Sequence, residues 1–176
     1  MIIVIIAYLM KACFQSSFQT KQMNQQIAAI KNTRTYLLTQ LETLSIDQLN
    51  EIPPGFNNNI VWNIGHIIAA QQGLCYIRSG NKLMVEDSFF AHYKSGTKPE
   101  RFVNADEWNE IKKQLFSTLD QLQEDYTQKL FHGYTPFTSR YNVEIKNIDD
   151  AIGFIQFHEG LHYGVANALK KLVTKP

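Results

Sequence analysis

Four stretches of the chain repeat apolar residues at every third or fourth position, the spacing that gathers them on one face of an α-helix. They cover residues 24–44, 58–79, 104–124 and 149–173. In the first stretch the apolar positions are Ile27, Ile30, Leu37, Leu38, Leu41 and Leu44. The pattern predicts an all-α fold, in which an antiparallel four-helix bundle buries these faces in one core.

Turn residues and helix caps separate the predicted helices. Pro53-Pro54-Gly55 breaks the chain before the second helix. Residues 104–107 have the pattern of a capping box, which satisfies free N–H groups where the third helix begins. Residues 80–103 and 131–146 contain Gly and Pro and are predicted to be irregular, with a short extended piece in the second of them.

Residues 1–22 form a leader that we expect to lie outside the domain, which then covers residues 23–176. The first ten residues are apolar, but a helix needs about 20 such residues to cross a bilayer. A secretory signal begins with a basic segment, and no basic residue precedes Lys11. Met23 opens a more ordinary N-terminus, so the leader is a misassigned start, a weak signal or a segment that touches a membrane.

Composition narrows the classes of partner. Apolar residues make up 44% and charged residues 19% of the 176 residues, a globular composition that fits one domain. The net charge is +1 without a long run of Lys or Arg, whereas a nucleic-acid binder needs a basic surface. Cys13 and Cys75 lie far apart and support no disulfide framework, which favours a reducing cytoplasm. We therefore expect a cytoplasmic protein with neither nucleic acid nor a membrane as its partner.

His158 and His162 are the first candidates for chemistry. They lie four residues apart in the last predicted helix, so both imidazoles leave the same face. That stripe is otherwise apolar and is expected to face the core; its other members are Ile155, Leu161, Val165 and Leu169. Two buried imidazoles without partners would each cost about 1–3 kcal/mol, and a shared metal ion would satisfy both. For this pair alone, hydrogen-bonded or partly exposed histidines are the alternative.

His66 adds a third imidazole from the middle of the second predicted helix. Helical bundles build metal sites from side chains on facing helices, so His66, His158 and His162 together predict a site for one divalent metal. Three nitrogen ligands leave coordination positions open, as catalytic sites require. Imidazole suits zinc, nickel, iron or copper, so the metal is not identified. Because imidazole binds metal in its neutral form, affinity is expected to fall below about pH 6.5.

Residues 158–162 also match the H-E-x-x-H pattern of zinc peptidases. Such peptidases usually take a third ligand after the second histidine, and the 14 residues that follow His162 contain no His, Asp, Glu or Cys. The peptidase is therefore the weakest functional hypothesis. Glu159 points about 100° away from His158 around the helix and is expected to be solvated or to support the ligands from behind.

Other polar and thiol groups have secondary interpretations. Trp62 and Asn63 lie one turn before His66 and either line the site, with Asn63 as a hydrogen-bonding support, or belong to the core and the surface respectively. His92 and His132 lie in the segments predicted to be irregular and are read as surface histidines. Cys75 is interpreted as a buried structural thiol.

Two motifs resemble those of the DinB-like family of metal-binding bundles. Residues 57–66 place a histidine after a W-x-x-G-H signature, and residues 157–164 supply H-x-x-x-H in the last helix. The resemblance covers about residues 23–173 and implies a four-helix bundle, often dimeric, with a metal on His66, His158 and His162. It also implies a small-molecule substrate and, by similarity to related enzymes, a low-molecular-weight thiol as cofactor.

Three functional hypotheses follow. The first is a metal-dependent thiol S-transferase, in which the metal lowers the pKa of a thiol and presents it to an electrophile. The second is a non-catalytic metal-binding or interaction module, and the third is the peptidase. An open pocket beside the metal favours the first, whereas a fourth protein ligand or a filled cavity favours the second. A homodimer is expected from the resemblance alone.

Overall fold

The computed structural model describes the backbone of residues 2–175 and the side chains of residues 11, 14, 15 and 17–175. The described chain is mostly helical, with one small antiparallel hairpin. The α-helices are α1 (Ile2–Leu41), α2 (Ile46–Asn50), α3 (Ile60–Gln71), α4 (Asp87–Tyr93), α5 (Ala105–Thr127) and α6 (Ile148–Val173). A π-helical turn η1 (Gln72–Tyr76) and a 3-10 turn η2 (Ile77–Ser79) prolong α3, and the hairpin pairs β1 (Phe137–Thr138) with β2 (Glu144–Ile145).

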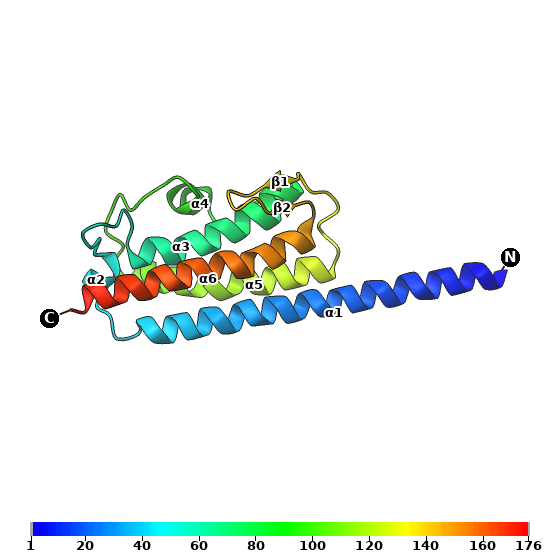
Figure 1. The fold of residues 1–176 in the computed structure, drawn as a ribbon, viewed down its shortest axis with the longest axis horizontal. Helices are drawn as coiled ribbons and strands as arrows, with labels where there is room; N and C mark the ends of the chain where they lie inside the picture. The colour runs from blue at the N-terminus through cyan, green and yellow to red at the C-terminus, as the bar shows by residue number, and fades with distance from the viewer. Residues whose placement is uncertain (1, 176) are drawn as a thin grey trace.

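The four long helices lie side by side (Figure 1). Helix α6 packs against α1 and α3, and helix α5 also packs against α1 and α3. Their directions differ from the predicted antiparallel order. Residues further along α1 contact residues further along α6: Gln19 bonds to Asp149, and Arg34 bonds to Glu159. These two neighbouring helices therefore run in the same direction. Helices α3 and α5 likewise run in one direction in Figure 1, and the long connection between them, which contains α4, carries the chain back.

The helix bounds confirm most of the predicted pattern and correct parts of it. Asn104 caps α5 in the predicted capping box with Glu107, and α6 begins after an Asn147 cap. The first helix begins at Ile2 instead of residue 24, because no Gly or Pro interrupts the chain before Pro53. The region 80–103 was predicted to be irregular, but it contains the short helix α4.

The first half of α1 extends beyond the ends of the other helices (Figure 1). Met23 is buried and belongs to the core, whereas Phe14 and Phe18 are exposed. The domain boundary at residue 22 stays a prediction, since α1 runs through it without a break. The thiol of Cys13 lies outside the described side chains. No helix in the described part of the chain is both long enough and apolar enough to cross a membrane.

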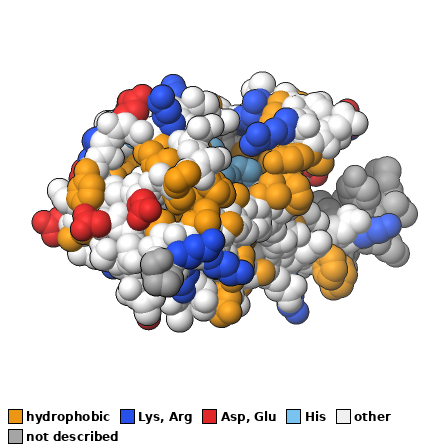
Figure 2. Space-filling model, turned by 60° about the vertical axis from the view of Figure 1, so that its left-hand side comes forward, with side chains coloured by type: hydrophobic (Ala, Val, Ile, Leu, Met, Phe, Trp, Pro, Cys, Tyr) orange, Lys and Arg blue, Asp and Glu red, His pale blue; other side chains and the backbone are white. Residues whose placement is uncertain are grey.

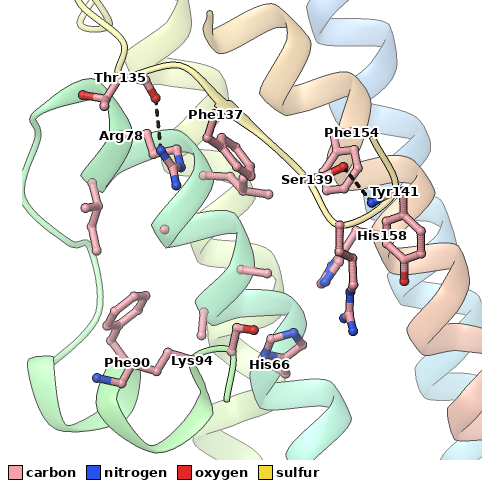
Figure 3. Close-up of a pocket in the computed structure, with 17 residues that line it drawn as sticks. His66, Arg78, Phe90, Lys94, Thr135, Phe137, Ser139, Tyr141, Phe154 and His158 are labelled. Carbon is pink, nitrogen blue, oxygen red and sulfur yellow. Dashed lines mark hydrogen bonds between the residues drawn. The ribbon is translucent and has the colours of Figure 1, made fainter. Parts of the chain in front are cut away.

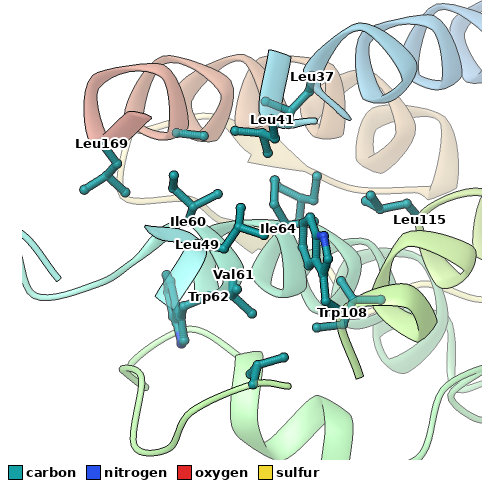
Figure 4. Close-up of a cluster of buried hydrophobic side chains, with 14 of the residues drawn as sticks. Leu37, Leu41, Leu49, Ile60, Val61, Trp62, Ile64, Trp108, Leu115 and Leu169 are labelled. Carbon is teal, nitrogen blue, oxygen red and sulfur yellow. The ribbon is translucent and has the colours of Figure 1, made fainter. Parts of the chain in front are cut away.

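The apolar core consists of two clusters placed one after the other along the bundle. One cluster is built around Trp62, Trp108 and Leu169 and is drawn in Figure 4. The other contains Ile27 and Ile155 with residues of η1 and the hairpin. The predicted apolar positions of the first helix enter these clusters, so its periodicity correctly identified the buried face.

A buried polar layer separates the two clusters, and each long helix contributes polar groups to it. Arg34 of α1 is fully buried and donates to both carboxylate oxygens of Glu159 on α6, over 2.6–3.2 Å. It also donates to Gln71 Oε1 of α3 at 3.1 Å and to the Leu115 carbonyl of α5. Gln71 in turn donates to the carbonyl of Thr118 at 2.8 Å. Such a layer is satisfied only when all four helices stand at the right height.

Replacing Arg34 with Met is expected to lower the free energy of unfolding by about 3–5 kcal/mol, because Glu159 would stay buried without its partner. Urea denaturation followed by circular dichroism measures the loss. Lys31→Met is the matched control on the same helix: Lys31 pairs with the exposed Asp120, and such pairs contribute about 1 kcal/mol or less. Equal losses in the two variants would contradict a structural role for the buried pair.

Candidate metal centre

Helices α3 and α6 position the three candidate histidines. Asn59 caps α3 by accepting a hydrogen bond from the Trp62 backbone N–H at 2.8 Å, and His66 follows two turns later. His158 and His162 lie in the middle of α6, one turn apart. The two helices pack directly against each other, as the site hypothesis requires, and they run in opposite directions.

The structure brings His66, His158 and His162 together. Their ring centroids are separated by 5.2 Å from His66 to His158, by 4.7 Å from His66 to His162 and by 4.6 Å between the last two. One ring nitrogen from each lies within 4.8 Å of the others. His66 and His158 are buried and His162 is half-buried. Among the described residues, this is the one group of three potential ligands close enough to hold a metal ion.

Two of the imidazoles are oriented by hydrogen bonds through Nδ1. His66 Nδ1 lies 2.7 Å from the carbonyl oxygen of Tyr93, and His162 Nδ1 lies 2.8 Å from Oδ1 of Asn63. A carbonyl oxygen only accepts, so Nδ1 of His66 carries the proton and its Nε2 keeps a free lone pair. With the Asn63 amide oxygen as acceptor, His162 takes the same tautomer. Partners of this kind hold metal-binding histidines in place.

The W-x-x-G-H motif has a physical role at each of its three positions. The indole of Trp62 stacks on the His66 ring, with centroids 4.7 Å apart and planes 8° from parallel. A Cβ added at Gly65 would lie 2.4 Å from Cδ1 of Tyr93. Only glycine therefore lets α4 approach α3 closely enough for the Tyr93 carbonyl to reach His66. The sequence did not reveal Tyr93, since its contribution comes from the backbone of a helix that was not predicted.

Burial keeps the cluster neutral. The pKa of His158 is lowered to about 4 and that of His162 to about 3, chiefly by loss of solvent and then by the neighbouring histidines; the pKa of His66 is lowered as well. His158 Nδ1 is buried without a hydrogen-bond partner among the described residues. An electron-pair acceptor at the cluster would satisfy it. Neutral imidazoles with free lone pairs fit a divalent ion, and they can hold one.

A cleft of about 720 Å³ opens beside the cluster. His66 and His158 line it together with η1, the hairpin segment and the end of α4. Figure 3 shows the two imidazoles on facing walls, with Phe90 on one side and Tyr141 and Phe154 on the other. The cluster is thus accessible from a space large enough for a small molecule.

A model of the DinB superfamily matches residues 29–166, which include all three histidines. The chain belongs to the DinB superfamily. The match covers most of the chain and confirms the family suggested by the two motifs. No curated protein matches the chain.

Glu159, which directly follows His158 in this DinB domain, is not solvated. Its carboxylate is buried and bound to Arg34 in the core, and it does not line the cleft. A peptidase of the H-E-x-x-H type needs this carboxylate near the metal as a general base. The arrangement therefore argues against peptidase chemistry. Leu161 was expected on the core face but is 37% exposed, because the buried stripe of α6 passes through Glu159 instead.

The remaining candidates lie outside the histidine cluster. His132 and His92 are exposed, as expected, although His92 belongs to α4 and not to a loop. Cys75 is fully buried, and burial raises the pKa of its thiol, which agrees with a structural role. The Asn63 amide is buried and bonded to His162, so it supports the cluster instead of lying on the surface.

We expect Gly65→Ala to weaken zinc binding by about 10- to 100-fold, because the added methyl would push Tyr93 away and release His66 Nδ1 from its carbonyl. Competition with a chromogenic chelator measures the affinity. Gly164→Ala is the control: a Cβ there meets no atom within 4 Å, and alanine favours the helix. Unchanged affinity in Gly65→Ala would show that the Tyr93 contact is dispensable.

The lowered pKa values predict how the metal-free chain responds to acid. NMR of the imidazole C–H groups measures the titration of each histidine. In the folded chain His158 should gain a proton near pH 4 and His162 near pH 3. In the urea-unfolded chain both should titrate near 6.5. Between these values the unfolded state binds more protons, so stability falls as the pH drops below 6.5. Protons would also compete with the metal for the folded site only at a pH well below the 6.5 that an ordinary imidazole implies. Folded-state titration near 6.5 would contradict this description of the site.

Proposed function

We propose that the chain binds one divalent metal ion through His66, His158 and His162 and uses it to activate a low-molecular-weight thiol for transfer to a small electrophile. The observation that carries the proposal is the position of the three neutral imidazoles beside an open cleft. Structural zinc sites are closed by four protein ligands, whereas catalytic sites keep a position open. The described residues offer three ligands here and no fourth.

The residues of the chain would have separate tasks. A divalent ion held by three uncharged ligands keeps its full charge, and this lowers the pKa of a thiol that reaches it. Tyr93 and Asn63 hold two of the imidazoles, so the ligands need little rearrangement when they bind. Trp62 covers one face of the His66 ring. The histidines serve as ligands and not as proton carriers.

A cleft of about 720 Å³ is within the usual size of small-molecule sites and supports the S-transferase over a purely structural metal. The competing proposal, a non-catalytic metal-binding module, is favoured by a different observation. No carboxylate is found among the described residues that line the cleft, so no acidic side chain is at hand to move a proton. An S-transferase would need the lowered pKa of the thiol to replace that base.

The bundle topology of the four long helices is part of the same proposal. We interpret the four long helices as the four-helix bundle of the family, with parallel neighbours where the connection through α4 crosses over. The homodimer and the cytoplasmic location stay predictions.

His66→Ala is expected to reduce bound metal from one ion per chain to a small fraction, while helix content stays close to that of the parent chain. Elemental analysis after dialysis measures the metal, and circular dichroism measures the helix content. The same change should abolish thiol transfer in assays that pair several thiols with model electrophiles. His92→Ala, on the exposed face of α4, is the control and should change neither.

The two proposals separate in this experiment. Metal retained by His66→Ala would contradict the site itself. Metal lost without any thiol transfer in the parent chain, across the thiols tested, would favour the non-catalytic module.

A further inference from the structure

The cleft beside the histidines has a one-sided charge. Arg78, Lys94 and Arg140 line it, and none of the described lining residues is acidic. Figure 2 shows Lys and Arg side chains around a hollow in which histidine surface is visible. The whole chain carries a net charge of only +1, so three positive groups around one cleft are a local concentration of charge.

No carboxylate among the described residues neutralises these three charges. In the part of the chain that the structure describes, no ion pair joins any of them to a carboxylate. Arg78 is also held in place: its guanidinium lies 3.7 Å from the centroid of the Phe137 ring and donates to the Thr135 carbonyl at 3.2 Å. A guanidinium fixed in this way keeps donors free for a ligand and loses little side-chain freedom when one binds.

Arg140 lines the same cleft as His66 and His158. A dication held by these histidines would be repelled by the guanidinium. An anion bound between the two positive centres would remove that repulsion and gain attraction from both. The charge arrangement therefore favours a negatively charged occupant of the cleft.

The rest of the lining is largely apolar. Aromatic rings come from both sides, with Phe90 on α4, Phe137 and Tyr141 on the hairpin segment and Phe154 on α6 (Figure 3). A ligand that matches both features carries an acidic group for the cations and an apolar body for the rings.

We propose that this cleft binds a small anion, a carboxylate or a phosphate ester with an apolar body, and that Arg78 and Arg140 recognise its acidic group. The proposal deepens the proposed function and rests on it in one respect, since it takes this cleft as the substrate site of the metal centre. The recognition itself depends on the cations and does not need the metal.

The test is isothermal titration of the full chain, zinc-loaded and after chelator treatment, with three probes of similar shape. The probes are 3-phenylpropionate, phenyl phosphate and the uncharged 3-phenylpropionamide. We expect at least one acid to bind about tenfold more tightly than the amide, with or without zinc, since charge-assisted hydrogen bonds exceed neutral ones. The better of the two acids identifies the acidic group. The preference should shrink as salt is raised.

Arg78→Gln/Arg140→Gln should reduce the preference to about twofold or less. Lys21→Gln/Lys171→Gln removes the same charge from exposed positions outside the cleft and should leave the preference intact. Because Arg78 contacts the hairpin, the exposed Arg140→Gln alone serves as a second variant and should lose part of the preference.

Equal binding of the acids and the amide would overturn the inference. A second result would also overturn it: a preference for the acid that survives Arg78→Gln/Arg140→Gln but is lost when zinc is removed. The acid would then bind to the metal and not to the two arginines. The proposed function would fail in a separate experiment, if His66→Ala retained its metal or if the parent chain bound no metal. The titration of the metal-free chain would still measure the anion site in either case.

Discussion

The buried ion pair between Arg34 and Glu159 is the interaction on which the arrangement of the four long helices depends. Apolar side chains tolerate small shifts along a helix axis, because one aliphatic contact resembles the next. A buried guanidinium does not, since each donor that misses its acceptor costs free energy in a low dielectric. Arg34 reaches Glu159, Gln71 and the Leu115 carbonyl at once, so α1, α3, α5 and α6 are held at one relative height. The two apolar clusters then pack on either side of this layer.

The histidine cluster follows from that register. Glu159 is the neighbour of His158 in α6, and Gln71 lies five residues after His66 in α3, so the layer that aligns these helices also brings the imidazoles to one level. Local contacts then orient the rings. The absence of a side chain at Gly65 admits Tyr93, whose carbonyl holds His66, and Asn63 reaches across from α3 to His162. The packing of the core and the geometry of the site therefore depend on the same helix register.

Electrostatics divides the functional region into two zones. The histidines lie in a desolvated place where positive charge is unfavourable and the imidazoles stay neutral, a condition for binding a cation through lone pairs. The cleft next to them is lined by aromatic rings and by cations that form no ion pair with a described carboxylate. A metal bound to the histidines would lower the free energy of binding an anion in the cleft, and the anion would in turn favour binding of the metal. This mutual compensation links the proposed function to the proposed class of ligand.

The amino-acid sequence by itself determined the helical class, most helix ends in the second half of the chain, the three histidines and the family, since periodicity, caps and short motifs are local properties. Arg34 stands on the same helical stripe as Ile30 and Leu37, a signal that was present, but a single Arg is usually read as a surface residue. Its partner Glu159 lies 125 residues away, and only the tertiary structure decided that the two meet in the core. The same holds for the parallel direction of α1 and α6, the Tyr93 carbonyl behind His66 and the cations around the cleft, because each depends on which distant segments the packed helices bring into contact.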